Sequence, residues 1–346
     1  MKDPSNGLLE LPGRSAARLL ALRQLDEWVK VRARLVNTSD PDDLHDFRVA
    51  LRRLRSLIRA FRSPEDEIVP PRLRRRLRRF AEATGESRDL DVQSAWVTAQ
   101  LPSLTARQRA GARWMLSRLN SRRGTASEHV LNRLAKRFDR LEEDLRSALA
   151  KGESQEGQQE AVLAGELVSD TIRRWTASME SELGVIQTIA DDAHAHAARI
   201  AAKRLRYVLE PFEDELPDIS LVIHRLKDLQ SLLGDFHDSH RMAGALLQES
   251  RAAAVVHAEW TFQDSLPWAN TDIELTTGRR RDPRPGLIAL AHRLSGQGEG
   301  LFSTLKNDWL ESGAASQLSG DLRAIAELVA TPHQPGAEIE PGFLAP

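Results

Sequence analysis

Two stretches of the chain place histidine, arginine and lysine at the same spacing. The first runs from residue 45 to 55 and the second from 196 to 206. In each, a histidine and three cations stand at positions i, i+3, i+7 and i+10, which share one face of a helix with 3.6 residues per turn. The two rows are His45, Arg48, Arg52 and Arg55, and His196, Arg199, Lys203 and Arg206. Side chains of these types, so aligned, are suited to binding an anion.

The length of each row indicates what kind of anion would match it. Successive cations lie about 5 Å apart along the helix, so each row extends about 15 Å. A single phosphate would contact only part of that length, whereas a linear anion with repeating charges would contact all of it. A solvated cationic face usually has acidic residues among its basic ones, and these rows contain none. Together with the recurrence of the spacing, this favours a binding site over a solvated surface. Arg53 and Arg204 also recur, but they point about 100° away from the rows, where a salt bridge or a ligand contact would both fit.

The two histidines begin their rows, which favours phosphate contact or orientation of a neighbouring arginine. The dipeptides His45-Asp46 and His237-Asp238 suggest an alternative, a metal-dependent phosphohydrolase. Surrounding arginines oppose a bound cation, and Ala197 replaces the aspartate in the second copy. We therefore expect no metal, no cofactor and no catalytic residue. The sequence also lacks cysteine and a phosphate-binding P-loop.

The composition of the 346-residue chain favours helices, since aromatic residues make up only 5% and leucine, alanine, arginine and glutamate dominate. The formal net charge is −1, yet bases far outnumber acids between residues 48 and 79. Local charge rather than total charge decides which ligands a surface attracts. No apolar run is long enough to span a bilayer, and the N-terminus lacks the apolar core of a secretion signal. We therefore expect a cytoplasmic protein with no membrane partner.

Helical periodicity and helix-breaking residues predict the elements that position these rows. In the first half, breaks at Gly85 and Gly124 are expected to separate helices. A linker at 151–157 then divides the chain into two domains, 14–150 and 158–330, flanked by disordered tails at 1–13 and 331–346. The predicted helices cover residues 14–36, 40–63, 70–85, 88–101, 105–150, 158–189, 191–211, 217–234, 235–263, 286–312 and 316–330.

The repeat extends beyond the rows. Gly85 is followed by Arg88-Asp89, and Gly234 is followed at the same distance by His237-Asp238. Each aspartate is interpreted as a helix cap or a salt-bridge partner after a glycine turn. Two copies of one pattern predict two repeats, each a four-helix bundle in an all-α protein. If the repeats face each other, both rows enter one groove.

The paired motif, His-x-x-Arg-Val/Ile-Ala-x-Arg/Lys-Arg-Leu-Arg with a later glycine and Arg/His-Asp, resembles the CHAD domain (conserved histidine α-helical domain) over residues 14–330. The resemblance implies two four-helix bundles related by a pseudo-twofold axis around a basic central cavity. It also implies binding of inorganic polyphosphate and association with polyphosphate granules. By position, it implies as ligand residues His45, Arg48, Arg52, Arg53, Arg55, Arg78, Arg88, His196, Arg199, Lys203, Arg204, Arg206 and Lys227.

Members of that family often follow an enzyme domain marked by Glu-x-Glu-x-Lys, which this chain lacks. No catalytic activity is therefore implied. A nucleic-acid binder is the second functional class, because the same rows could follow a sugar-phosphate backbone. Single-strand binders interleave aromatic side chains for base stacking. Here only Tyr207 lies within the second motif, and the first motif has no aromatic residue on its cationic face. Neither the oligomeric state nor a preferred chain length follows from these patterns.

Overall fold

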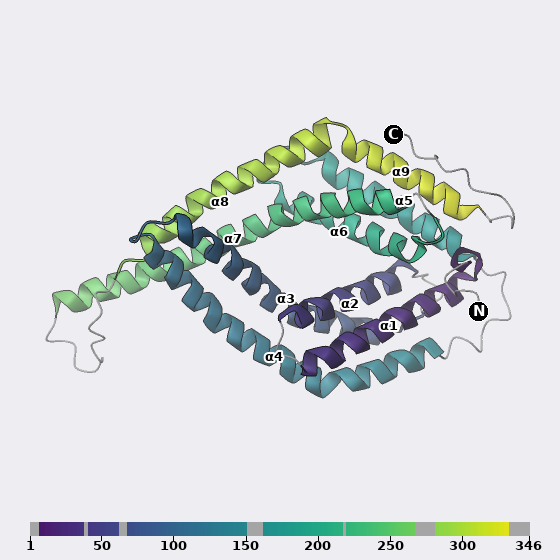
Figure 1. The fold of residues 1–346 in the computed structure, drawn as a ribbon, viewed down its shortest axis with the longest axis horizontal. Coiled ribbons are helices and arrows are strands. Elements are labelled where there is room, and N and C mark those ends of the chain that lie inside the picture. The colour runs from purple at the N-terminus through teal and green to yellow at the C-terminus, as the bar shows by residue number, and fades with distance from the viewer. Residues whose placement is uncertain are drawn as a thin grey trace. The chain divides into compact units, whose positions relative to one another are not determined.

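The computed structural model describes residues 7–37, 41–61, 68–150, 162–216, 219–266 and 281–331, with the backbone alone at 36–37, 41–42, 86–87, 126–136 and 264. Within these ranges all the regular elements are helices (Figure 1). One isolated β-bridge pairs Pro12 with Leu163. The predicted all-α class is confirmed. The elements are η1 (Leu8–Glu10), α1 (Gly13–Asn37), α2 (Pro41–Ala60), α3 (Pro71–Gln100), η2 (Leu101–Ser103), α4 (Arg109–Ala150), α5 (Ala164–Gly184), α6 (Asp192–Leu209), η4 (Glu210–Phe212), α7 (Ile219–Ser265), α8 (Arg284–Thr304), the π-helix η6 (Leu305–Glu311) and α9 (Ala314–Ala330).

Three predicted helix breaks are wrong. α3 continues through Gly85, α4 through Gly124 and α7 through Gly234. An interior glycine costs a helix only about 0.5–1 kcal/mol relative to alanine, which the packing of a long helix readily offsets. Among the described glycines, only Gly7 and Gly313 adopt the positive φ that a helix-ending glycine requires. Asp89 and Asp238 therefore lie inside continuous helices and do not cap them.

The prediction of a disordered N-terminal tail over 1–13 is wrong for residues 7–13. Leu8 begins a 3₁₀-helix and is only 1% exposed. Its backbone N–H donates a hydrogen bond to Glu215 Oε1 at 3.2 Å. This buried leucine holds the segment against the protein, a contact that local sequence does not reveal. Residues 1–6 and 332–346 and the predicted linker at 151–157 lie outside the described residues.

The chain divides into two compact units that do not coincide with the predicted domains. Unit 1 comprises Met1–Gly85, Val130–Gly234 and Thr304–Pro346, and unit 2 comprises Glu86–His129 and Asp235–Ser303. Each unit draws on both halves of the sequence. α3 and α7 enter unit 2 directly after Gly85 and Gly234, the two glycines that match in the sequence repeat. The internal duplication itself stays a prediction.

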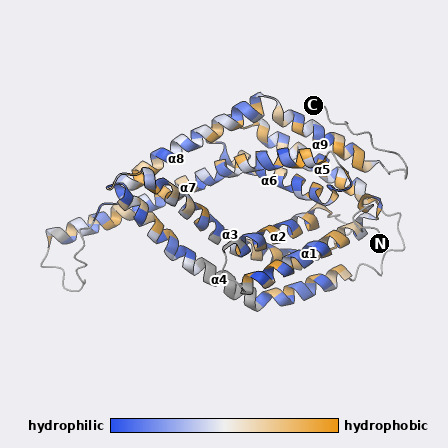
Figure 2. Ribbon diagram, in the orientation of Figure 1, coloured by the Kyte–Doolittle hydropathy of each residue, from blue (hydrophilic) through white to orange (hydrophobic). Residues whose placement is uncertain are grey.

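Unit 1 is built on amphipathic helices, of which α1 packs against α2, α5 packs against both α6 and α9, and α2 contacts α6. In Figure 2, hydrophilic and hydrophobic residues alternate along these helices. Trp28 of α1 is fully buried among Phe47, Phe80 and Phe138, which come from α2, α3 and α4. The ring centroids of Trp28 and Phe138 lie 4.6 Å apart. This aromatic cluster fixes α2 against three other helices, so the first row stands on a rigid support.

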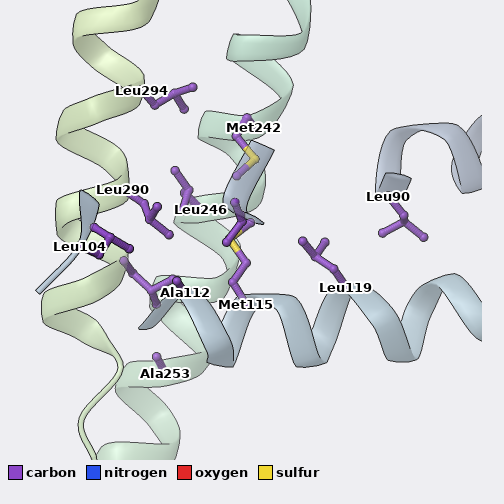
Figure 3. Packing of buried hydrophobic residues seen from close by; sticks show 12 residues of the cluster. Leu90, Leu104, Ala112, Met115, Leu119, Met242, Leu246, Ala253, Leu290 and Leu294 are labelled. Carbon is purple, nitrogen blue, oxygen red and sulfur yellow. The ribbon is translucent and has the colours of Figure 1, made fainter. Parts of the chain in front are cut away.

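Unit 2 has a separate apolar cluster, shown in Figure 3. Met115 and Leu119 come from α4, Met242 and Leu246 from α7, and Leu290 from α8. These side chains are almost completely buried. Methionine and leucine together fill the irregular space where the three helices meet. Each unit therefore has its own core.

Candidate anion-binding site

The two rows lie on α2 and α6, which contact each other within unit 1. The apolar sides of the two helices differ in size. α2 buries Leu51, Leu54 and Leu57, whereas α6 buries the alanines at 195, 198, 201 and 202. Small residues let the α6 backbone approach its neighbours closely, and the charged sides of both helices remain at least partly accessible. On each helix the row therefore lies beside a buried apolar side.

Tyr207 connects the two row helices. Arg52 Nε donates a hydrogen bond to the Tyr207 hydroxyl at 2.9 Å, and the tyrosine is only 2% exposed. The Arg206 guanidinium carbon lies 4.5 Å from the centroid of the same ring. One buried aromatic residue thus holds a cation of each row, which restricts their rotamers before any ligand binds.

Arg48 and Arg199 make equivalent contacts in the two halves. Arg48 Nη1 donates to the carbonyl oxygen of Thr84, one residue before Gly85, at 3.3 Å. The Arg199 guanidinium lies against Gly234, and a Cβ at position 234 would lie only 3.0 Å from Arg199 Nε. The first cation of each row therefore contacts the following helix near the repeated glycine. In the second half, the absence of a side chain at Gly234 leaves room for Arg199, which links the glycine to the motif.

The end of the second row is partly neutralised. Glu210 forms ion pairs with Arg206 at 2.5 Å and with Arg53 at 3.2 Å. The salt-bridge interpretation of Arg53 is therefore correct. At the corresponding position of the first row, one turn beyond Arg55, stands Arg59. The matching positions Arg59 and Glu210 thus carry opposite charges.

An arginine cluster forms at the end of the first row, and we define it as Arg55 and Arg59 of α2, Arg174 of α5 and Arg204 of α6. Burial and the three neighbouring guanidinium groups, Arg59 foremost, lower the pKa of Arg204 to about 10. Burial and then Arg59 also lower the pKa of Arg55. Within the described part of the chain, no carboxylate forms an ion pair with any of the four. Such repulsion is reduced by a bound anion.

Trp175 supports this cluster from one side. The Arg204 guanidinium carbon lies 4.0 Å from the centroid of a Trp175 ring, and that of Arg174 lies at 5.5 Å. Cation–π contacts of this kind hold a guanidinium over an aromatic face. They compensate part of the unfavourable charge and orient Arg204. Because Arg204 already covers this ring, the tryptophan is poorly placed to stack on a nucleobase.

A pocket of about 600 Å³ lies beside the end of the second row. In the sequence, the offset between His45 and His196 also relates Arg23 to Arg174 and Arg53 to Arg204, so this pocket and the arginine cluster include residues at matching positions of the repeat. Its charged lining is Arg23, Glu27, Arg53, Arg206, Glu210, Glu213 and Lys227. This pocket carries mixed charge, whereas the arginine cluster carries only positive charge.

The remaining predicted residues are more scattered. His45 is exposed, whereas His196 and Lys203 are partly buried on α6. Arg78 forms an ion pair with Glu82 at 3.1 Å. Arg88 belongs to unit 2, where it pairs with Asp238 at 3.4 Å.

Beside that pair, Arg241 of α7 binds Asp89 of α3 at 2.6 Å. The salt-bridge interpretation of the two repeated aspartates is therefore correct. Burial raises the pKa of Asp89, although the neighbouring arginines oppose this shift. These exchanged pairs join α3 and α7 within unit 2.

Sequence reasoning did not identify Arg59, Arg174 or Trp175. Arg59 could have been found by extending the first row by one further turn, since it follows Arg55 at i+4. Arg174 and Trp175 lie on α5, outside the repeated motif, and only the three-dimensional packing brings them to Arg204. Residues remote in sequence carry no periodic signal that links them.

No cluster of three or more histidine and carboxylate side chains that could hold a metal ion occurs among the described residues. Among these residues, too, none of the helices combines the length and apolar character that crossing a membrane requires.

The chain is similar to a known protein family and to solved structures. A family model described as the CHAD domain matches residues 19–248. The crystal structure of the CHAD domain from the plant Ricinus communis is 21% identical in sequence, covers 91% of each chain and gives a TM-score of 0.57. The structure of PptA from Streptomyces chartreusis is 13% identical, covers 86% of this chain and 98% of that one, and gives a TM-score of 0.60. No curated protein sequence matches the chain.

Proposed function

The chain belongs to the CHAD domain family, and from this premise we propose that it binds inorganic polyphosphate without converting it. The ligand residues are those predicted from the two rows, joined by Arg59 and Arg174. The resemblance of the motifs to this family also leads us to expect association with polyphosphate granules. The observation that carries the proposal is the arginine cluster of α2, α5 and α6, which forms no ion pair with a carboxylate among the described residues.

The physical support comes from the shape of the charge distribution. Rows of cations about one helical turn apart match an anion that carries a charge on each repeating unit. In the unbound protein, burial and then repulsion from the neighbouring guanidinium groups lower the pKa of Arg204. Phosphate groups placed among them convert this repulsion into charge-assisted hydrogen bonds. Arg53, Arg78, Arg88 and Arg206 already pair with carboxylates, so they gain less on binding.

The alternative that the same residues bind nucleic acid has less support. Sequence-tolerant binding of single strands relies on aromatic platforms. Trp175 is covered by Arg204 and Tyr207 is buried. A polyphosphate needs no such platform, because it has no base to stack.

The test is a competition experiment at one fixed salt concentration. Labelled long-chain polyphosphate is bound, and unlabelled polyphosphate, single-stranded DNA and duplex DNA are compared at equal phosphate concentration. We expect polyphosphate to compete far better than either DNA. The double variant Arg55→Gln/Arg204→Gln should weaken polyphosphate binding by about a hundredfold, since each lost charge-assisted contact is worth at least about 1.4 kcal/mol.

The matched control is Lys30→Gln/Lys306→Gln, which removes two exposed charges of unit 1 that belong to neither row. It should bind as the wild type does. Equal competition by DNA would favour the nucleic-acid alternative, and unchanged affinity in the Arg55/Arg204 variant would remove the cluster from the site. Sustained release of phosphate with magnesium or manganese present, abolished by His237→Ala, would instead support a phosphohydrolase.

A further inference from the structure

A second basic pocket of unit 1 lies between α3 and α4, outside the two motif rows. Its volume is about 630 Å³. Its floor includes Phe80, which is only 7% exposed and packs edge-on against Trp28 and Phe138. We name this pocket the α3–α4 pocket. Its charged lining residues are Arg72, Arg76, Arg79, Arg137, Arg140 and Asp144. The floor is therefore part of the rigid aromatic core.

The charge of this pocket is strongly unbalanced. Arg76 pairs with Asp144, which neutralises both groups. The other four arginines are exposed, and none of them forms an ion pair with a carboxylate in the described part of the chain. Four uncompensated guanidinium groups around a concave surface favour an anion that carries several charges.

α3 connects this pocket to the first row. Arg78 of α3 lies near enough to Arg55 of α2 for its charge to add to burial and Arg59 in lowering the pKa of Arg55. At 100° per residue, Arg75 lies about 60° around the helix from Arg78. The three α3 arginines of the pocket follow within about a further 100°. The arginines of α3 therefore form a basic arc from the α2 row to the α3–α4 pocket, on which Glu82 also lies and pairs with Arg78. Arg75, Arg78 and Arg79 on this arc are all exposed.

We propose that the α3–α4 pocket is a second subsite for polyphosphate, reached by chains that leave the α2 row and curve around α3. The proposal rests on the function proposed above. A short chain would be satisfied within the rows, whereas a long chain would occupy both places. A helix with side chains is only about 10–12 Å across, so the path requires a flexible polyanion. Duplex DNA, with a persistence length of about 50 nm, is too stiff to follow it.

The test compares a short chain of about ten phosphates with a long chain of about one hundred, on the wild type and on Arg79→Gln/Arg140→Gln. Both substituted side chains are exposed, and circular dichroism verifies the fold. The double variant should bind the long chain at least tenfold more weakly, by loss of charge-assisted contacts. Its affinity for the short chain should change by less than about twofold. Lys30→Gln/Lys306→Gln removes the same charge elsewhere on unit 1 and should leave both affinities unchanged.

Three results would overturn the subsite. An unchanged long-chain affinity would exclude a contact in the pocket. An equal loss for both chain lengths would indicate a general field effect rather than a subsite that only long chains reach. An equal loss in the lysine control would indicate total charge alone. If instead the wild type binds neither chain, the proposed function itself fails, which distinguishes that failure from the failure of the subsite.

Discussion

Arg59 and Glu210 stand at matching places at the ends of the two rows, and they change the electrostatics in opposite directions. Glu210 neutralises Arg206 and Arg53 through two ion pairs. Arg59 adds a positive charge to a cluster whose pKa values are already lowered by burial. The unbound protein therefore keeps an unfavourable concentration of charge at the first row end. Arrangements of this kind are typical of binding sites, where a ligand supplies the missing opposite charge.

The change Arg59→Gln should therefore raise stability and lower affinity together. Removing the charge relieves repulsion on Arg204 and Arg55, so the melting temperature of the unbound protein should rise by about 1–2 °C. The affinity for polyphosphate should fall about tenfold, the value of one charge-assisted contact. Differential scanning fluorimetry and a binding titration measure the two effects. Arg59→Lys keeps the charge, so its melting temperature and its affinity should both change less than those of Arg59→Gln. A loss of both stability and affinity would show that Arg59 is a structural residue.

At the scale of the helix, the two repeated glycines do different things. A Cβ on Gly85 would meet nothing within 4 Å, whereas one on Gly234 would meet the Arg199 guanidinium at 3.0 Å. Both positions are interior to long helices, where alanine is preferred over glycine. Helix propensity therefore favours alanine at both places, but only Gly234 makes room for a row cation.

Gly85→Ala and Gly234→Ala form a matched pair that tests this difference. Gly85→Ala should stabilise the protein by about 0.5–1 kcal/mol and leave polyphosphate affinity unchanged. Gly234→Ala should gain less stability, because the Arg199 guanidinium must shift by a few tenths of an ångström. Its affinity should fall severalfold. Denaturant unfolding and binding titrations measure both. Equal affinity in the two variants would mean that the position of Arg199 does not matter for the ligand.

For the whole molecule, the net charge of −1 conceals how the charges are distributed. The rows, the arginine cluster and the α3–α4 pocket all belong to unit 1. In unit 2, the described Arg88, Arg118 and Arg123 each pair with a carboxylate. The residues proposed to bind the anion, apart from Arg88, therefore lie in unit 1.

The sequence predicts some of these features well and others poorly, for physical reasons. The 3.6-residue period of leucines and cations determines the faces of α2, so its row could be predicted from sequence alone. Gly124 was expected to end a helix, but tertiary packing outweighs the small intrinsic cost of a glycine. Arg174 reaches the site only through the packing of α5 against α6, which no local pattern encodes. Unit boundaries depend in the same way on contacts between distant segments.

The separation of the two units leads to a prediction about Leu290, which is completely buried in the unit 2 cluster. Leu290→Ala should destabilise the protein by about 2–5 kcal/mol, because it removes apolar contacts and leaves a cavity. Under conditions in which the variant is still folded, its polyphosphate affinity should equal that of the wild type.

The matched control is Leu54→Ala, a substitution of a leucine with 1% exposure on the row helix α2. It should cost similar stability and also weaken binding, because it loosens the support of the row. Denaturant unfolding and titrations at low temperature measure both quantities. If Leu290→Ala weakened binding as much as Leu54→Ala, unit 2 would have to contribute directly to the site, with Arg88 as the first residue to examine.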